Sequence, residues 1–374
     1  MGKGAGGPPV VVQRLVEAAR EAGVSADIIT SSDFLSDGEA QSLLESGVTV
    51  IPSQVSALAG QQAVKVEKAI NNADLLHCHT LWSPLVSRSA AIARRLGKPY
   101  VLAPHGMLDP YSFRQKNLKK RLYLEGIERK TINSASRVLF TALEERILAE
   151  RTFGSIANAA VVPLGADGLP QDRAILRDRF LDQHTDLCGR PLLLFMGRLH
   201  PKKRPEILPD VISAIGRDCP GSTLIFAGSG EDSFVAKIKA RSQDLGLGDR
   251  VRFLGHLSGE AKFSALAAAD LFLLPSHQEN FGIAVAEALH AGVPVILTRN
   301  VNIWKDIEEA DAGVAVTDDD LVQRLVRAVT TLLKDGERWN LMSRNAKKLA
   351  TEAFSWEASC RRTLQIYEDV LAEG

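Results

Sequence analysis

The chain has 374 residues, of which 45% are hydrophobic and 24% are charged, as in ordinary globular proteins. Basic and acidic residues balance at 45 each, so the overall charge gives no reason to expect a nucleic-acid partner. No apolar run approaches the ~18–20 residues that a membrane-spanning helix needs, and the N-terminus lacks the apolar segment of a signal peptide. We therefore expect a soluble cytoplasmic protein of roughly two or three domains.

Short apolar runs alternate with amphipathic helical patterns along the chain. In the first half the expected strands are residues 26–30, 75–78, 100–103, 137–140 and 160–162. In the second half they are residues 192–196, 223–227, 251–254, 271–274, 294–297 and 313–316. Nearly continuous apolar runs are typical of parallel strands buried on both faces, and the helices between them indicate βαβ units.

The two sets of strands predict an α/β protein with two Rossmann-like halves. A polar stretch over residues 166–190 precedes a fresh strand and marks the boundary. We expect an N-terminal domain over residues 1–168, a C-terminal domain over 169–352, and a last helix within 353–374 that packs back toward the N-terminal domain. Ligands of such sheets bind beyond the carboxyl ends of the strands, so we expect the site in the cleft between the halves.

The first glycines of the chain spell G-x-G-x-x-G, the fingerprint of a dinucleotide-binding turn, at Gly2, Gly4 and Gly7. That chemistry needs a strand immediately before the glycines, and here the chain begins at them. An NAD-dependent oxidoreductase is therefore a weak interpretation of this sequence.

The densest motif is SHQENFGIAVAEALHAG at residues 276–292. It predicts a helix from about residue 283 to 290, with Asn280 as its N-cap and Gly292 at its end. The free N–H groups at the start of such a helix attract anions. Glu279 and Glu287 flank this start, and a carboxylate that accepts two hydroxyl hydrogen bonds can hold a sugar. On this segment alone, a capped surface helix with two solvated glutamates is an equal alternative.

The wider pattern resembles the retaining glycosyltransferases of the large bacterial family 4, which have the GT-B fold. The two glutamates are spaced E-x7-E, as in that family. The other motifs that carry the resemblance, at family spacing, are GRLHPKK (197–203), LIFAGSGE (224–231), VRFLGH (251–256), AEALHAGVPVI (286–296) and FSWEASC (354–360). APHGMLDPY (103–111) resembles a branch found among enzymes of exopolysaccharide and lipopolysaccharide assembly.

The resemblance implies two Rossmann-like domains that face each other across a cleft. It implies a hexosyltransferase that retains anomeric configuration and uses a nucleoside-diphosphate sugar, with a UDP-sugar favoured and GDP-mannose as the alternative. The implied acceptor is a glycan or a lipid-linked sugar of cell-surface polysaccharide synthesis. It implies no metal and no other cofactor.

The resemblance also assigns roles to residues. Arg198 and Lys203 would neutralise the leaving diphosphate, Glu279 would bind the transferred sugar, Glu287 the ribose, and His105 the sugar or phosphate. Further donor contacts are implied at Gly7, Leu257, Asn280, Phe281, Gly282, Ile283 and Ala284.

Two features depart from the family pattern. Arg204 stands where the family usually has glycine, which affects the loop after Lys203. Family members also carry a first strand just before the glycine loop that contains Gly7, and this chain starts after that strand. We expect this to leave two central strands unpaired on one side, and the first half to be less stable than the second.

A basic segment over residues 114–130 has apolar positions at roughly helical spacing. Such a helix can lie on an anionic membrane face, so we expect weak peripheral contact with the inner membrane. A solvated face on a core-packed helix is an equal alternative. The basic residues are Arg114, Lys116, Lys119, Lys120, Arg121, Arg129 and Lys130.

Metal sites find no support in the sequence. The four cysteines form no CxxC pair, and His77 and His79 lack a third ligand at a suitable spacing. The acidic run at residues 318–320 looks like a helix cap rather than a D-x-D motif.

Other functions remain open at this point. A glycosidase also uses two carboxylates, but it would give the basic residues no role. A GT-B-like epimerase, a phosphorylase or a degenerate sugar-nucleotide-binding subunit are the remaining alternatives.

Overall fold

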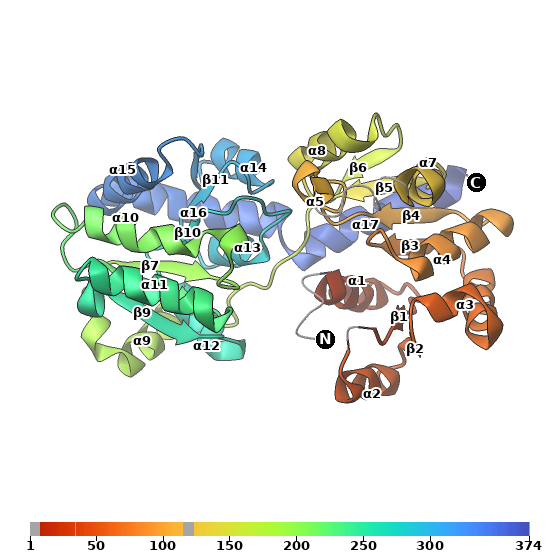
Figure 1. The fold of residues 1–374 in the computed structure, drawn as a ribbon, viewed down its shortest axis with the longest axis horizontal. Helices are drawn as coiled ribbons and strands as arrows, with labels where there is room; N and C mark the ends of the chain where they lie inside the picture. Colours follow the sequence, from red (N-terminus) through yellow and green to blue (C-terminus); the bar gives the residue numbers. More distant parts are fainter. Residues whose placement is uncertain (1–7, 34, 115–122, 374) are drawn as a thin grey trace. The chain divides into compact units, whose positions relative to one another are not determined.

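The computed structural model describes residues 8–33, 35–114 and 123–373, which form two compact units. Unit 1 comprises Met1–Leu164 and Trp356–Gly374, and unit 2 comprises Gly165–Ser355. Both units have parallel strands with helices between them (Figure 1). The expectation of two Rossmann-like α/β units is confirmed.

Unit 1 alternates short strands and helices. Its strands are β1 (Ile29–Ser31), β2 (Thr49–Ile51), β3 (Leu76–His79), β4 (Tyr100–Ala103), β5 (Arg137–Phe140) and β6 (Ala159–Val161). Its α-helices are α1 (Pro8–Glu21), α2 (Asp37–Glu45), α3 (Gly60–Asn72), α4 (Pro84–Arg95), α5 (Pro110–Arg114), α7 (Arg129–Asn133), α8 (Leu143–Phe153) and α17 (Trp356–Glu373). A 3-10 turn, η1 (Val55–Leu58), and a π-helix, η2 (Leu124–Glu128), complete it.

The main sheet of unit 1 has the parallel order β3-β4-β5-β6, and β1 and β2 form a separate parallel pair. Side chains of β4 alternate between two cores, as the pleat of a strand requires. Tyr100 and Leu102 join the larger core, while Val101 and Ala103 pack with Val370 of α17 on the other face. Helix α17 thus belongs to the core of unit 1.

Unit 2 contains one six-stranded parallel sheet. Its strands are β7 (Leu192–Met196), β8 (Thr223–Ala227), β9 (Val251–Gly255), β10 (Leu271–Leu274), β11 (Val295–Thr298) and β12 (Gly313–Val316). Its α-helices are α9 (Arg173–Gln183), α10 (Leu208–Ala214), α11 (Asp232–Asp244), α12 (Gly259–Ala268), α13 (Ile283–His290), α14 (Trp304–Glu309), α15 (Leu321–Lys334) and α16 (Gly336–Ala353). Its 3-10 turns are η3 (Thr185–Leu187), η4 (Pro201–Lys203), η5 (Pro205–Ile207) and η6 (Gly248–Arg250).

The strand order in unit 2 is β12-β11-β10-β7-β8-β9. Every residue of β7, β8, β10 and β11 is buried, because helices cover both faces of this sheet. The apolar runs at these positions therefore predicted the strands to within one residue.

Strand β2, which has three residues, was not predicted from the sequence. Strand β1 begins three residues later than expected. Among the described residues, β1 pairs with β2, and β3 pairs with β4 alone. A strand before Gly7 would fall outside the described residues, so that expectation stays a prediction. In the described part of the chain, no helix is both long and apolar enough to cross a membrane.

Two glycines of unit 2 allow the loops after β7 and β8 to touch. The N–H of Gly197 donates to the carbonyl of Ala227 (2.9 Å), and the N–H of Leu199 donates to the carbonyl of Ser229 (2.8 Å). A Cβ on Gly228 would overlap the carbonyl oxygen of Gly197, and one on Gly230 would overlap that of Leu199. The two glycines therefore fix the loop after β8 against the loop that carries Arg198.

Gly228→Ala is expected to lower the free energy of unfolding by about 1–3 kcal/mol, the usual effect of overpacking. The added methyl group must displace the loop that carries Arg198. Gly336→Ala is the matched control, because no atom lies within 4 Å of its added Cβ. Chemical denaturation of the two variants measures the effect. Equal stability in both variants would contradict the close approach of the two loops.

Candidate donor-binding site

The order of the strands in unit 2 reverses between β7 and β10. Strands β8 and β9 lie on one side of β7, and β11 and β12 lie on the far side of β10. Ligands of open α/β sheets bind at such a switch point, outside the carboxyl ends of the two strands. The loop after β7 carries Arg198 and Lys203, and the loop after β10 carries Glu279. Three of the predicted site residues therefore follow the two strands at the switch point.

Lys203 and Glu279 form an ion pair between these loops, 76 residues apart in sequence. Each side chain is 21% exposed, so the pair is partly shielded from water but still reachable by a ligand. The methylene groups of Lys203 also pack beside Gly197. The structure thus brings together Lys203, which is predicted to bind the diphosphate, and Glu279, which is predicted to bind the sugar.

Arg198 is exposed, and none of the described residues forms a salt bridge with its guanidinium. The loop around it is electropositive. Burial lowers the pKa of His200, and Arg198 and Lys202 lower it further. Arg198 is therefore available for an anionic ligand.

Helix α13 begins at Ile283, as expected, but its N-cap position is held by Gly282 at φ 78°. Asn280 does not cap this helix, so that prediction was wrong. Hydrogen bonding in the first turn runs from the N–H groups of Val285 (2.8 Å) and Ala286 (3.3 Å) to the carbonyl of Gly282. The N–H groups of Ile283 and Ala284 precede this turn, as helix geometry requires, and remain candidates for the sugar and phosphate. Phe281 itself is buried against Phe354, with ring centroids 5.3 Å apart.

Glu287 lies four residues into α13 and is buried. Burial raises the pKa of its carboxyl, and Lys262 of α12 opposes that shift. The Nζ of Lys262 lies 2.7 Å from Oε1 of Glu287. Sequence reasoning missed Lys262, because the two residues lie 25 positions apart on different helices. A ribose at Glu287 would have to share or replace this ion pair.

Leu257, the predicted contact of the base, is half-buried at the edge of a hollow of about 330 Å³. Phe180 and His184 line the other side of this hollow. The ion pair of Arg179 and Glu260 also lines the hollow, so the lining is mixed, and the predicted contact at Leu257 is through its backbone.

His105 lies in unit 1, directly after β4, and takes the left-handed conformation at φ 51°. Its turn is fixed by buried Glu145, which accepts the N–H of Gly106 (2.5 Å) and the N–H of Thr141 (2.6 Å). The Nε2 of His105 lies 3.0 Å from Nδ1 of His79, whose ring stacks on that of His77. His79 at the end of β3 and Glu145 of helix α8 thus hold the His105 turn in place.

The three imidazoles are neutral at pH 7. Burial lowers the pKa of His105 to about 4 and that of His77 to about 3, and it lowers the pKa of His79 as well. His77 is also hydrogen bonded through Nδ1 to the hydroxyl of Tyr367 on α17 (2.6 Å). In the described part of the chain, no group of three or more His, Cys, Asp or Glu side chains could hold a metal ion. Neutral imidazoles can exchange hydrogen bonds with sugar hydroxyls.

Several predicted contacts fall on residues that the structure does not describe. Gly7 lies outside the described residues, as do Lys116, Lys119, Lys120 and Arg121 of the basic segment. Within the described part, Arg129 pairs with Glu125 (2.7 Å) and its guanidinium lies over the ring of Phe153 (4.8 Å). Arg129 therefore has a role in packing unit 1, and membrane contact of residues 114–130 stays a prediction.

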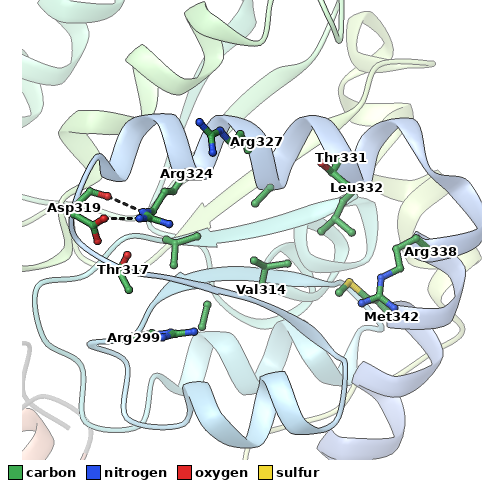
Figure 2. Close-up of a pocket in the computed structure, with 13 residues that line it drawn as sticks. Arg299, Val314, Thr317, Asp319, Arg324, Arg327, Thr331, Leu332, Arg338 and Met342 are labelled. Atoms are coloured by element: carbon green, nitrogen blue, oxygen red, sulfur yellow. Dashed lines mark hydrogen bonds and ion pairs between the residues drawn. The ribbon is translucent and has the colours of Figure 1, made fainter.

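A groove of about 700 Å³ lies beside edge strand β12 and helix α15 (Figure 2). None of the described residues predicted to bind the donor lines it. Carboxylates pair with three of its four arginines: Asp319 with Arg324, Asp311 with Arg338, and Glu308 with Arg299. The ion pair of Arg324 and Asp319 is visible in Figure 2. This groove is distinct from the residues at the β7–β10 switch point.

Two family models match the chain, one in each half. The "Glycosyl transferase 4-like domain" matches residues 6–165, and "Glycosyl transferases group 1" matches residues 178–349. These matches identify each half of the chain as a glycosyltransferase domain, and the two Rossmann-like units have the GT-B fold.

Individual relatives refine this placement. The D-inositol 3-phosphate glycosyltransferase of Corynebacterium urealyticum is 26% identical over 98% of this chain and 91% of the relative. The protein of the same name from Corynebacterium kroppenstedtii is 29% identical over 53% of this chain, which spans 45% of that relative. The crystal structure of HepE from Anabaena with UDP and glucose has a TM-score of 0.76 at 19% identity, over 97% of this chain and 96% of that chain. This last likeness concerns the fold.

Acidification is expected to destabilise the β3–β4 region. In the unfolded chain a histidine takes up a proton near its ordinary pKa of 6.5, whereas the half-buried imidazoles of His77 and His105 stay neutral to about pH 4. The free energy of unfolding is therefore unaffected by these histidines above pH 6.5 and decreases as the pH falls toward 4. The decrease is at most about 1.4 kcal/mol per pH unit for each histidine.

His79→Asn keeps a polar group beside His105 and removes one titrating group. The loss of hydrogen-exchange protection of β3 and β4 amides between pH 7 and pH 5 should be smaller in this variant than in the wild type. An identical loss in both proteins would show that the imidazoles do not set the acid sensitivity.

Proposed function

We propose that this protein is a retaining, metal-independent glycosyltransferase that transfers a hexosyl group from a nucleoside-diphosphate sugar. The observation that carries the proposal is the pairing of Lys203 with Glu279 at the switch point of the unit 2 sheet. A cation for the diphosphate and a carboxylate for the sugar hydroxyls stand side by side there. The match of residues 178–349 to the group 1 glycosyltransferases supports the same reaction.

The diphosphate would take the place that Glu279 now holds beside the Lys203 ammonium. Arg198, exposed on the same loop, would supply a second cation, and the N–H groups of Ile283 and Ala284 would add hydrogen bonds. Glu279, released from the ion pair, would accept hydrogen bonds from two hydroxyls of the transferred sugar. Glu287 would accept those of the ribose.

The chemistry breaks the bond between C1 of the sugar and the phosphate oxygen. Fixed positive groups lower the barrier because they stabilise the charge that develops on the leaving diphosphate. The acceptor hydroxyl attacks C1 from the same face, and its proton passes to the departing phosphate oxygen. Configuration at C1 is thereby retained. In this scheme Arg198 and Lys203 supply the positive charge, and no metal or other cofactor is required.

UDP is the favoured nucleotide, because HepE was solved with UDP and glucose. GDP-mannose is the alternative donor. For the acceptor, the resemblance of residues 103–111 to polysaccharide-assembly enzymes favours a glycan or a lipid-linked sugar at the cytoplasmic face of the membrane. The names of the Corynebacterium relatives favour a second candidate, an inositol phosphate.

A panel of UDP- and GDP-sugars in a donor-hydrolysis assay tests the proposal without knowledge of the acceptor. Lys203→Ala should lower turnover by about 100-fold or more, the usual effect of removing one group that stabilises transition-state charge. Lys202→Ala is the matched control from the same turn, and it should stay within a few fold of the wild type.

Thermal stabilisation by UDP and by GDP separates the remaining alternatives, because a bound ligand raises the melting temperature. Stabilisation without turnover would indicate a degenerate binding subunit. Turnover that gives an isomerised nucleotide sugar would indicate an epimerase. Neither stabilisation nor turnover with any donor would refute the proposed site.

A further inference from the structure

Arg204 occupies a backbone conformation that favours glycine. It lies between the turns η4 and η5 with φ 53° and ψ 39°, in the left-handed region. A non-glycine residue is uncommon there, and such strain persists where the surroundings hold the residue in place. Arg204 is also 9% exposed, which is rare for an arginine without partners. The side chain must therefore make interactions that keep it at this position.

The guanidinium of Arg204 joins three loops at the carboxyl ends of the strands. Its Nη1 lies 2.9 Å from Nδ1 of His277, in the loop after β10. Its Nη2 lies 2.9 Å from Oδ1 of Asp318, in the loop after β12. The N–H of His277 also donates to the carbonyl of Lys202 (2.8 Å), so the first two loops are tied twice.

The arginine contact fixes the state of the His277 ring. Because a guanidinium only donates hydrogen bonds, Nδ1 of His277 must accept, and the ring is neutral with its proton on Nε2. Burial lowers the pKa of His277, Arg204 lowers it further, and Asp318 opposes them. His277 stands two residues before Glu279 in the same loop.

A second path leads from Arg204 to the backbone of Glu279. The other carboxylate oxygen of Asp318 accepts a hydrogen bond from the side-chain amide of Asn300 (2.7 Å). The carbonyl of Asn300 accepts the N–H of Glu279 (3.0 Å), and the N–H of Asn302 donates to the carbonyl of Glu279 (3.1 Å). Arg204 is thus covalently next to Lys203 and is linked through Asp318 and Asn300 to the backbone N–H of Glu279.

We infer that Arg204 is a positioning residue that holds Glu279 against Lys203 by clamping the loops after β7, β10 and β12. The inference rests on the proposed function of these two residues and adds a member that the family pattern, with glycine here, does not contain. Groups held in advance in the correct geometry act on a transition state without reorganisation. Glycine at this position would leave the loop free to move, whereas the contacts of Arg204 hold it in one conformation.

Arg204→Gly tests the inference, because glycine accepts the left-handed backbone without strain. We expect kcat for donor hydrolysis to fall at least tenfold, since Lys203 and Glu279 lose their alignment. The KM for the donor should change by less than about threefold, because the predicted base and ribose contacts at Leu257 and Glu287 do not depend on Arg204. Arg327→Ala is the control, because Arg327 is exposed on α15, and it should leave kcat and KM unchanged.

Two further variants keep the test decisive if Arg204→Gly folds poorly. Arg204→Lys keeps the charge but loses the two-pronged contact, and Asp318→Asn keeps the shape but loses the charge. Both should lower kcat, and the effects of Arg204→Gly and Asp318→Asn should be less than additive when combined, as expected of one network. Folded variants with wild-type kcat would overturn the inference.

The nitrogen chemical shifts of His277 give a readout that does not depend on activity. The wild type should show a neutral ring protonated on Nε2, and Arg204→Gly should lose this preference and raise the pKa of the ring. Unchanged shifts would overturn the clamp. If the wild type neither binds UDP or GDP nor turns over any donor, the proposed function fails, while the His277 shifts still report on the clamp.

Discussion

The ion pair between Lys203 and Glu279 is the contact on which the rest of the site depends. It exists because the strand order of unit 2 reverses between β7 and β10, so that the loops after these two neighbouring strands meet. When no ligand is bound, the attraction between the two opposite charges keeps both side chains ordered. In the proposed function, a diphosphate sugar would offer each of them a new partner at once, which would couple binding of the phosphate to binding of the sugar.

The loops that carry this pair are held by contacts that leave little freedom. Gly228 and Gly230 let the loops after β7 and β8 touch backbone to backbone, where any side chain would overlap a carbonyl oxygen. On the opposite side, Arg204 reaches the loops after β10 and β12. The loop after β7 is therefore held by two kinds of contact: glycines that leave room for its backbone, and the long side chain of Arg204.

The sequence predicted much of this architecture, for reasons that particular residues make clear. Residues 192–196 and 271–274 were recognised as strands because they are buried on both faces and carry no polar residue. Helix α13 ends as expected at Ala291 and Gly292, since glycine at φ 67° closes a helix. Its N-cap was wrongly assigned to Asn280, because Gly282 takes the left-handed cap position without any side-chain signal. The partners of Arg204 lie 73 and 114 residues away, and Lys262 meets Glu287 from another helix. Because these residues meet only when the sheet has formed, no local sequence pattern predicts their pairing.

A crystal structure of the wild-type protein with UDP-glucose tests the central claim most directly. The claim predicts that the β-phosphate lies within hydrogen-bond distance of Lys203 Nζ, and that Glu279 has left the lysine for the hydroxyls of the glucose. The uridine ribose should lie at Glu287. A nucleotide bound in the arginine-lined groove beside β12, or a Lys203–Glu279 pair that stays intact with the site fully occupied, would contradict it.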